Sequence, residues 1–296
     1  AGYPKPFVIV LAASAALLEA LIPPSNAAIL YSALTYVPVS QTFAAGVFPG
    51  LILLLFMIAL VLFKCRHIER SKPATNYEKL ILGIKAFPAL LTPLIILGGI
   101  YGGLLTPSES AAVSGIWAIF MGFLIYRELT IGSLLKSIKD TAITTSVIFS
   151  IIAMATFLSK VFTYTQFPQF IIKSITDMGV GLNFFWFAMA LICLILGTFI
   201  EIVPVFYLTI PIFTAIILSF DQSLIHLYVV FVAFAGIGMI TPPVCVGIYT
   251  SASVIKENPG NAFKEVPLFT VVGILYGILM ILFPGLSTWL PNYLSG

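Results

Sequence analysis

Two short stretches combine a proline pair with small polar residues inside apolar sequence, and both could bind an ion or a substrate. They read LIPPSNAAILYSA (21–33) and ITPPVCVGIYTSA (240–252). Proline has no N–H group, clashes with the preceding helical turn and moves the residue before it out of helical conformation. Each pair therefore frees C=O groups that suit a cation and N–H groups that suit an anion. The alternative is an ordinary kink whose freed groups are paired by neighbouring Ser and Thr.

Three acidic residues lie in or beside apolar segments, where an ionisable group is expensive and often functional. Glu201 marks the middle of GTFIEIVPVFYLTIPIF, where it could orient a hairpin tip, cap the second arm or help to hold a cation. Glu109 follows Thr106 and Ser108, so capping of a new helix is the favoured interpretation there. Glu19 precedes the first proline pair and faces either the site or a polar partner.

Other kinds of chemistry are not indicated. The chain has no GxxxxGK(S/T), HExxH or GxSxG motif, so energy for any transport must come from an ion gradient or from another polypeptide. Two histidines exclude a histidine metal cluster, and three cysteines indicate packing residues rather than a disulfide framework. We therefore expect a non-enzyme without a cofactor. An intramembrane protease is disfavoured because no paired acids or histidine constellation is present.

The composition places these features in a membrane. The chain is 60% hydrophobic and 8% charged, with a mean hydropathy of +1.13. The alternating decamers of a membrane β-barrel are absent, so we predict an all-α polytopic membrane protein. A helix of roughly 20 apolar residues crosses about 30 Å of membrane. Apolar runs of this length occur near 45–63, 88–104, 107–126, 141–162, 183–200, 203–219 and 266–283. Two further runs, at 7–35 and 225–253, are interrupted by the proline pairs.

The distribution of basic residues predicts the topology. We take the segment 64–86 as cytoplasmic and the segment 183–219 as a re-entrant hairpin that returns to the outside. With these assignments, 12 of the 14 Lys and Arg residues lie inside, as membrane insertion favours. Only Lys160 and Lys173 then lie outside.

The two proline stretches also form an internal repeat with opposite orientation. A shift of 219 residues aligns Pro23 with Pro242 and Pro24 with Pro243, and three further identities follow within the next ten residues. In the predicted topology the first broken span runs from inside to outside, and the second runs from outside to inside. Inverted repeats of this kind characterise secondary transporters.

Four motifs, in the same order along the chain, resemble one known family. They read GYPKPFVIVLAASAALLEALIPPS, PALLTPLIILGGIYGGLLTPSESAAV, GTFIEIVPVFYLTIPI and ITPPVCVGIYTSASV. Together they resemble the large membrane subunit, called DctM, of tripartite ATP-independent periplasmic (TRAP) transporters, over the whole length of the chain. The resemblance implies an inverted-repeat, elevator-type secondary transporter with broken helices and a re-entrant hairpin, in the bacterial cytoplasmic (inner) membrane.

The resemblance also implies a function and partners. The chain would be the permease of a sodium symport system that imports an organic acid, such as a C4-dicarboxylate or sialic acid. A periplasmic substrate-binding protein would deliver the acid, a small membrane (Q-type) subunit would complete the complex, and no nucleic acid would be bound. The alternative is a stand-alone ion-coupled carrier of the dicarboxylate or citrate type. The sequence leaves the identity of the acid, the sodium stoichiometry and the oligomeric state open.

Domains and site residues follow from the same resemblance. The implied segments are the first broken helix (1–35), scaffold helices with amphipathic segments (36–140), a connecting helix with an external segment (141–182), the re-entrant hairpin (183–219), the second broken helix (220–255) and a C-terminal helix (256–296). The implied ion- and substrate-binding residues are Ile22, Pro23, Pro24, Ser25, Asn26, Thr198, Phe199, Glu201, Gly238, Thr241, Pro242 and Pro243. Among them, Thr198, Gly238 and Thr241 are the implied sodium ligands.

The chain departs from the family pattern at the tip and at the second break. Many members have Asp-Pro-Thr where this chain has Glu201 and its two successors, and a glycine where it has Cys245. These differences leave ion and substrate preference open. The family has further residues before GYPK, including a first hairpin, so we expect the chain to start in the middle of a larger protein. A secretory signal at 5–20 is disfavoured because the apolar run continues through the proline pair.

Overall fold

The computed structural model describes residues 3–68, 75–177 and 181–295, and every regular element in these ranges is a helix. Part of the predicted cytoplasmic segment 64–86 lies outside the described residues. The helices are α1 (Lys5–Leu21), α2 (Asn26–Thr35), α3 (Val39–Lys64), α4 (Asn76–Tyr101), α5 (Pro107–Phe120), the π-helical turn η1 (Met121–Ile125), α6 (Ile131–Tyr164), α7 (Phe167–Asp177), α8 (Leu182–Phe199), α9 (Ile202–Ser219), α10 (Leu224–Ile240), α11 (Val246–Ile255), the 3₁₀ turn η2 (Pro259–Lys264), α12 (Val266–Leu282) and α13 (Gly285–Ser295).

Six of these helices are long and apolar enough to cross a membrane: α3, α4, α5 with η1, α6, α8 and α9. Two further pairs pass the same test together but are bent, α1–α2 by 45° and α12–α13 by 55°. The described residues therefore form an all-α polytopic membrane protein, as predicted.

Several predicted spans are parts of longer elements. The span 88–104 belongs to α4, which begins earlier because Thr75 and Glu78 form a capping box at its start. The span 141–162 belongs to the 34-residue helix α6. The C-terminal segment was predicted as one helix, but it is two, because Phe283 before Pro284 is not helical (ψ 73°).

The described residues divide into two compact units, 75–153 and 3–68 with 154–295. In the first unit α4 and α5 pack together as a helical hairpin, joined by hydrogen bonds such as Trp117 Nε1 to Pro88 O at 3.0 Å. The start of α5 confirms the predicted cap, because Thr106 N donates to Glu109 Oε2 at 2.7 Å and Glu109 N donates to Thr106 Oγ1 at 3.3 Å.

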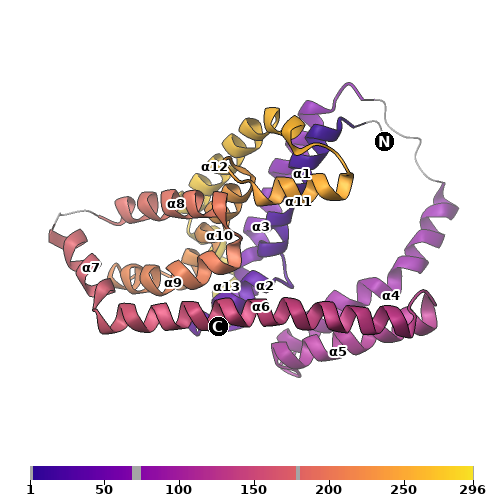
Figure 1. The fold of residues 1–296 in the computed structure, drawn as a ribbon, viewed down its shortest axis with the longest axis horizontal. Helices are drawn as coiled ribbons and strands as arrows, with labels where there is room; N and C mark the ends of the chain where they lie inside the picture. The colour runs from indigo at the N-terminus through magenta and orange to yellow at the C-terminus, as the bar shows by residue number, and fades with distance from the viewer. Residues whose placement is uncertain (1–2, 69–74, 178–180, 296) are drawn as a thin grey trace. The chain divides into compact units, whose positions relative to one another are not determined.

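The second unit is built around α10. Fourteen of its 17 residues are buried, which is the burial expected for a helix that is apolar on every side. It packs against α1, α8, α9 and α12 (Figure 1). Helix α3 also packs in this unit, against α1 and α13. The division into scaffold and transport segments stays a prediction.

The two broken helices run antiparallel within this unit. Lys5 Nζ, at the start of α1, forms an ion pair with Glu257 Oε2, just after α11, at 2.8 Å. At the other end Tyr31 OH, in α2, donates to Leu224 O, at the start of α10, at 2.6 Å. The first broken helix therefore begins where the second ends, as the opposite orientation of the repeat predicts.

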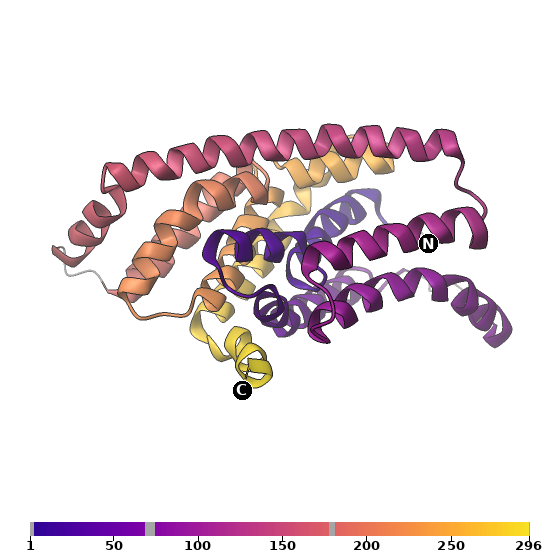
Figure 2. The ribbon, with the colours of Figure 1, turned by 90° about the horizontal axis from the view of Figure 1, so that it is seen from below.

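Helices α8 and α9 form a hairpin beside the second broken helix. Near its open end Trp186 contacts His226 at the start of α10, with ring centroids 5.0 Å apart. Near its tip Gly197 lies against Gly238 at the end of α10. The hairpin therefore turns back at the level of the break, ten residues before α11 ends, which is about 15 Å of helix. Figure 2 shows the same hairpin from below, with α7 beside its open end.

Candidate ion and substrate site at the second helix break

The second break is an exposed loop between two helix ends. Helix α10 ends at Ile240 and α11 begins at Val246, while Pro242 and Pro243 between them are exposed and joined by a cis peptide bond. Cys245 is buried in a left-handed conformation (φ 56°) and gives α11 no side-chain cap. The first N–H groups of α11 therefore lack the partner that a capping side chain supplies to many helices.

The hairpin tip docks onto this break through its backbone. Cys245 N donates to Thr198 O at 3.3 Å. A Cβ atom added to Gly238 would lie 2.5 Å from Leu194 O and 2.7 Å from the Cα of Gly197, so no larger residue fits there without movement. The structure therefore brings Thr198 and Gly238 together with the residues of the second break, as the site prediction requires.

The two threonines at this junction can accept or coordinate but have no proton left to donate. Thr198 Oγ1 donates to Ile195 O, and Thr241 Oγ1 donates to Ile237 O, both at 2.8 Å. A hydroxyl has one proton and two lone pairs, so each oxygen can still accept a hydrogen bond or coordinate a cation. The carboxyl-terminal end of α10 adds partial negative charge at the same place. Both features suit a cation.

Thr270 is a residue of this junction that the sequence analysis missed. Its Oγ1 lies 3.3 Å from Thr241 Oγ1. Because the proton of Thr241 is already used, Thr270 is the donor in this pair. A single threonine in the apolar run of α12 was the signal that could have found it.

The other predicted tip residues are exposed. Phe199 is 54% exposed, and Glu201 is exposed at the N-cap position of α9 without a side-chain capping bond. Of the roles considered for Glu201, side-chain capping of α9 is therefore wrong. Glu201 lies at the uncapped start of α9, directly after the hairpin tip. The uncapped start of α11 follows Cys245, whose N–H group donates to Thr198 O of the same tip.

The first break is closed by neighbouring groups. Ser25 accepts from Ala28 N at 3.3 Å as the cap of α2, and its hydroxyl donates to Ala20 O at 2.9 Å. Tyr228 OH donates to the same carbonyl. Gly46 of α3 packs directly on Leu21 O, with no room for a side chain.

Of the first-break residues, Ser25 is buried, and Pro23 and Pro24 are partly buried. Ile22 and Asn26 are exposed. The hydrogen bonds that Ile22 and Ser25 form with α1 and α2 run to Leu18 O, Ala20 O, Ala28 N and Ile29 N. A shared role of the two breaks in binding stays a prediction.

Comparison with known proteins identifies the family. Residues 1–286 match the model of the tripartite ATP-independent periplasmic transporter, DctM component. A C4-dicarboxylate TRAP transporter large permease protein DctM from Vibrio cholerae is 34% identical over all of this chain and 70% of its own length. The chain belongs to the DctM family of TRAP transporter permeases.

Relatives of this DctM chain carry names with different substrates. A C4-dicarboxylate large permease from Pseudomonas aeruginosa is 31% identical over 99% of this chain and 69% of its own length. A sialic acid large permease, SiaM, from Vibrio cholerae is 28% identical over the whole chain and 70% of its own length. Membership of the DctM family therefore fixes the class of protein, a membrane permease, and leaves the transported compound to other evidence.

Proposed function

We propose that this DctM chain is the permease subunit of a sodium-coupled secondary transporter that imports an organic acid. The observation that carries the proposal is the contact between the hairpin tip and the second break, through Cys245 N and Thr198 O. Broken helices in secondary transporters supply carbonyls and helix ends as ion ligands. In our proposal sodium is held by Thr198, Gly238 and Thr241, where two hydroxyl oxygens offer only lone pairs.

The same junction offers a place for a carboxylate. Helices α9 and α11 both begin there without a side-chain cap, so their amino-terminal N–H groups and dipoles favour an anion. A sodium ion beside them would offset part of the charge of the acid. In this proposal the ion stabilises the docked tip, and substrate binding follows. An elevator movement of the hairpin with the broken helices then exposes the site to the other side.

The partners and location belong to the same proposal. The relatives are named large permeases of TRAP transporters. We therefore propose that a small membrane subunit and a periplasmic binding protein complete the system in the inner membrane. The binding protein would select the acid, which agrees with the variety of substrates in the names of relatives.

Uptake by the reconstituted complex tests the proposal. The full permease with a small subunit is placed in proteoliposomes, and labelled succinate or N-acetylneuraminate is added together with a purified periplasmic binding protein for that acid. We expect uptake to require both a sodium gradient and the binding protein. Equal uptake with potassium in place of sodium would overturn sodium coupling. Uptake without the binding protein would overturn the three-component system in favour of a stand-alone carrier.

A further inference from the structure

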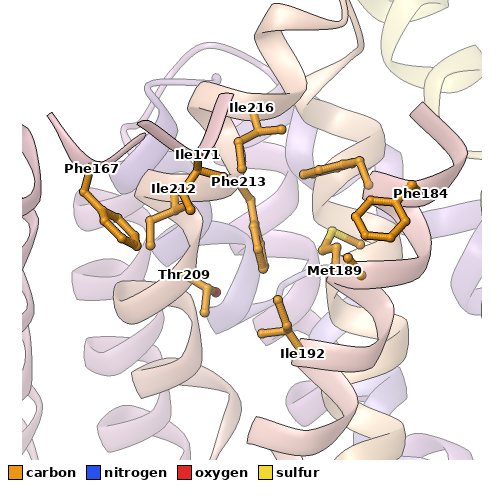
Figure 3. Close-up of a pocket in the computed structure, with 11 residues that line it drawn as sticks. Phe167, Ile171, Phe184, Met189, Ile192, Thr209, Ile212, Phe213 and Ile216 are labelled. Atoms are coloured by element: carbon orange, nitrogen blue, oxygen red, sulfur yellow. The ribbon is translucent and has the colours of Figure 1, made fainter. Parts of the chain in front are cut away.

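An apolar cavity that is partly open at the surface lies between α7, α8 and α9, near the open end of the two arms of the hairpin. Its volume is about 380 Å³, which is within the range of small-molecule sites. Figure 3 shows the side chains of α7, α8 and α9 converging on it, with Phe213 between the arms. The lining residues are Phe167, Ile171, Phe184, Phe185, Ala188, Met189, Ile192, Thr209, Ile212, Phe213 and Ile216.

The lining has no group that could bind the polar part of a ligand. Thr209 is its one polar residue, and the Thr209 hydroxyl donates to Val205 O at 2.7 Å within α9. A carboxylate in this cavity would lose its hydration without gaining a donor, and a peptide would leave backbone groups unpaired. A hydrocarbon chain has no such groups, so it is the ligand that this lining accepts without an electrostatic cost.

Helix α7 carries cavity-lining residues on one face and a lysine on the other. The helix is amphipathic, and Phe167 and Ile171 on one face line the cavity. Lys173 is exposed, and its position two residues after Ile171 places it on the opposite face. Phe162 of α6 stacks on Phe167 with ring centroids 5.0 Å apart, so the end of α6 packs against the start of α7. An amphipathic helix of this kind lies in the headgroup layer with its charged side toward water.

We propose that the cavity binds one acyl chain of a membrane phospholipid whose phosphate lies near Lys173. The chain fills the space between Met189 of α8 and Phe213 of α9 and holds the two arms at their present separation. These arms carry the tip that docks on the second break, so the lipid stabilises the docked tip from outside the transport site. Lipid binding is independent of which acid the protein transports.

Photocrosslinking tests the site directly. The probe is phosphatidylglycerol with a diazirine in its acyl chain, added to the purified full complex, and crosslinked peptides are located by mass spectrometry. We expect label on Met189, Ile192 or Phe213. Ala188→Trp fills the cavity and should lower this label about tenfold, because several buried methylenes are displaced. The control is Leu191→Trp, which places the same indole side chain in a separate groove on α8.

The headgroup is tested with a charge change. Lys173→Glu should lower the label about fivefold, whereas Lys136→Glu, an exposed lysine earlier in α6, should not change it. Circular dichroism and gel filtration check folding of each variant, and Ile192→Trp replaces Ala188→Trp if the latter does not fold. Label confined to other surfaces, label on the small subunit only, or equal label in the Ala188→Trp and Leu191→Trp proteins would overturn the proposal.

Discussion

The two helix breaks share a sequence pattern and an inverted orientation, but they differ in what closes them. At the first break, Ser25 and Tyr228 both donate to Ala20 O, and α3 packs on Leu21 O. At the second break, the proline pair is exposed, and Cys245 N donates to Thr198 O of the hairpin tip. The first break is closed by hydrogen bonds and packing from neighbouring helices, whereas the second is contacted by the backbone of the hairpin tip.

We expect the different closure of the two breaks to separate effects on stability from effects on ion binding. Groups that are already paired within packed helices contribute to folding and have little capacity for a ligand. Lone pairs and helix ends that stay open at a junction between two elements can respond to an ion. Changes at the first break should therefore alter stability, and changes at the second break should alter ion binding.

The largest effect is expected from matched glycine substitutions, one beside each break. A Cβ atom at Gly46 would collide with Leu21 O, and one at Gly197 would collide with Ala235 O. We expect Gly46→Ala to destabilise the protein by about 3 kcal/mol because backbone must move. Sodium affinity of the protein that still folds should be unchanged.

Gly197→Ala should instead lower sodium affinity, because it moves the hairpin tip away from α10. Thermal unfolding in detergent and binding of ²²Na⁺ to the purified complex measure the two quantities separately. Equal loss of sodium affinity in both variants would contradict the distinction between the breaks.

A smaller and more specific effect is expected at Thr241. Thr241→Val removes an oxygen while keeping the shape of the side chain, so the sodium concentration for half-maximal uptake should rise about tenfold. Thr241→Ser keeps the hydroxyl and should restore most of the affinity. Matched changes at Ser25 of the first break, to Ala and Thr, should leave the sodium dependence as it is.

Thr270 should have a weaker effect, because it acts through Thr241. Thr270→Val removes the donor at 3.3 Å and loosens the position of the Thr241 hydroxyl. We expect the half-maximal sodium concentration to rise about threefold with an unchanged maximal rate, and Thr270→Ser to reverse the change. A fall in maximal rate at unchanged sodium dependence would show that Thr270 only packs α12 against α10.

The sequence predicted what depends on local chemistry. Proline pairs interrupt helices wherever they occur, so the positions of both breaks followed from the residues themselves, as did the cap formed by Thr106 and Glu109. Both arms of the hairpin were predicted to within one residue at each end, because long apolar runs with a polar interruption leave few alternatives.

Contacts between distant residues could not be predicted in this way. Tyr228 reaches Ala20 across 208 residues, and Thr270 reaches Thr241 across 29. Neither pair has a spacing that marks it in the sequence. The different closure of the two breaks depends on such contacts, so two similar sequences were predicted to have similar roles.

The smallest effect is expected where the two broken helices meet at their ends, at Lys5 and Glu257. The hydrogen bond from Lys5 Nζ lowers the pKa of Glu257 below its ordinary value of 4.5. A carboxylate with a lowered pKa in the folded state stabilises the protein above its unfolded pKa, and this contribution disappears as pH falls through the folded pKa. Glu257→Gln should therefore lower the melting temperature slightly at pH 7, and variant and wild type should converge as the pH falls through the lowered pKa of Glu257.

The effect at Glu257 should be small because the pair is at the surface, with the Lys5 side chain 65% exposed. The double variant Lys5→Gln/Glu257→Gln separates the pair from the single charges, since its stability should equal that of Glu257→Gln alone. Sodium dependence of uptake should stay as in the wild type, because the pair joins the ends of the broken helices rather than their breaks. A change in sodium dependence would mean that the helix ends and the second break move as one body.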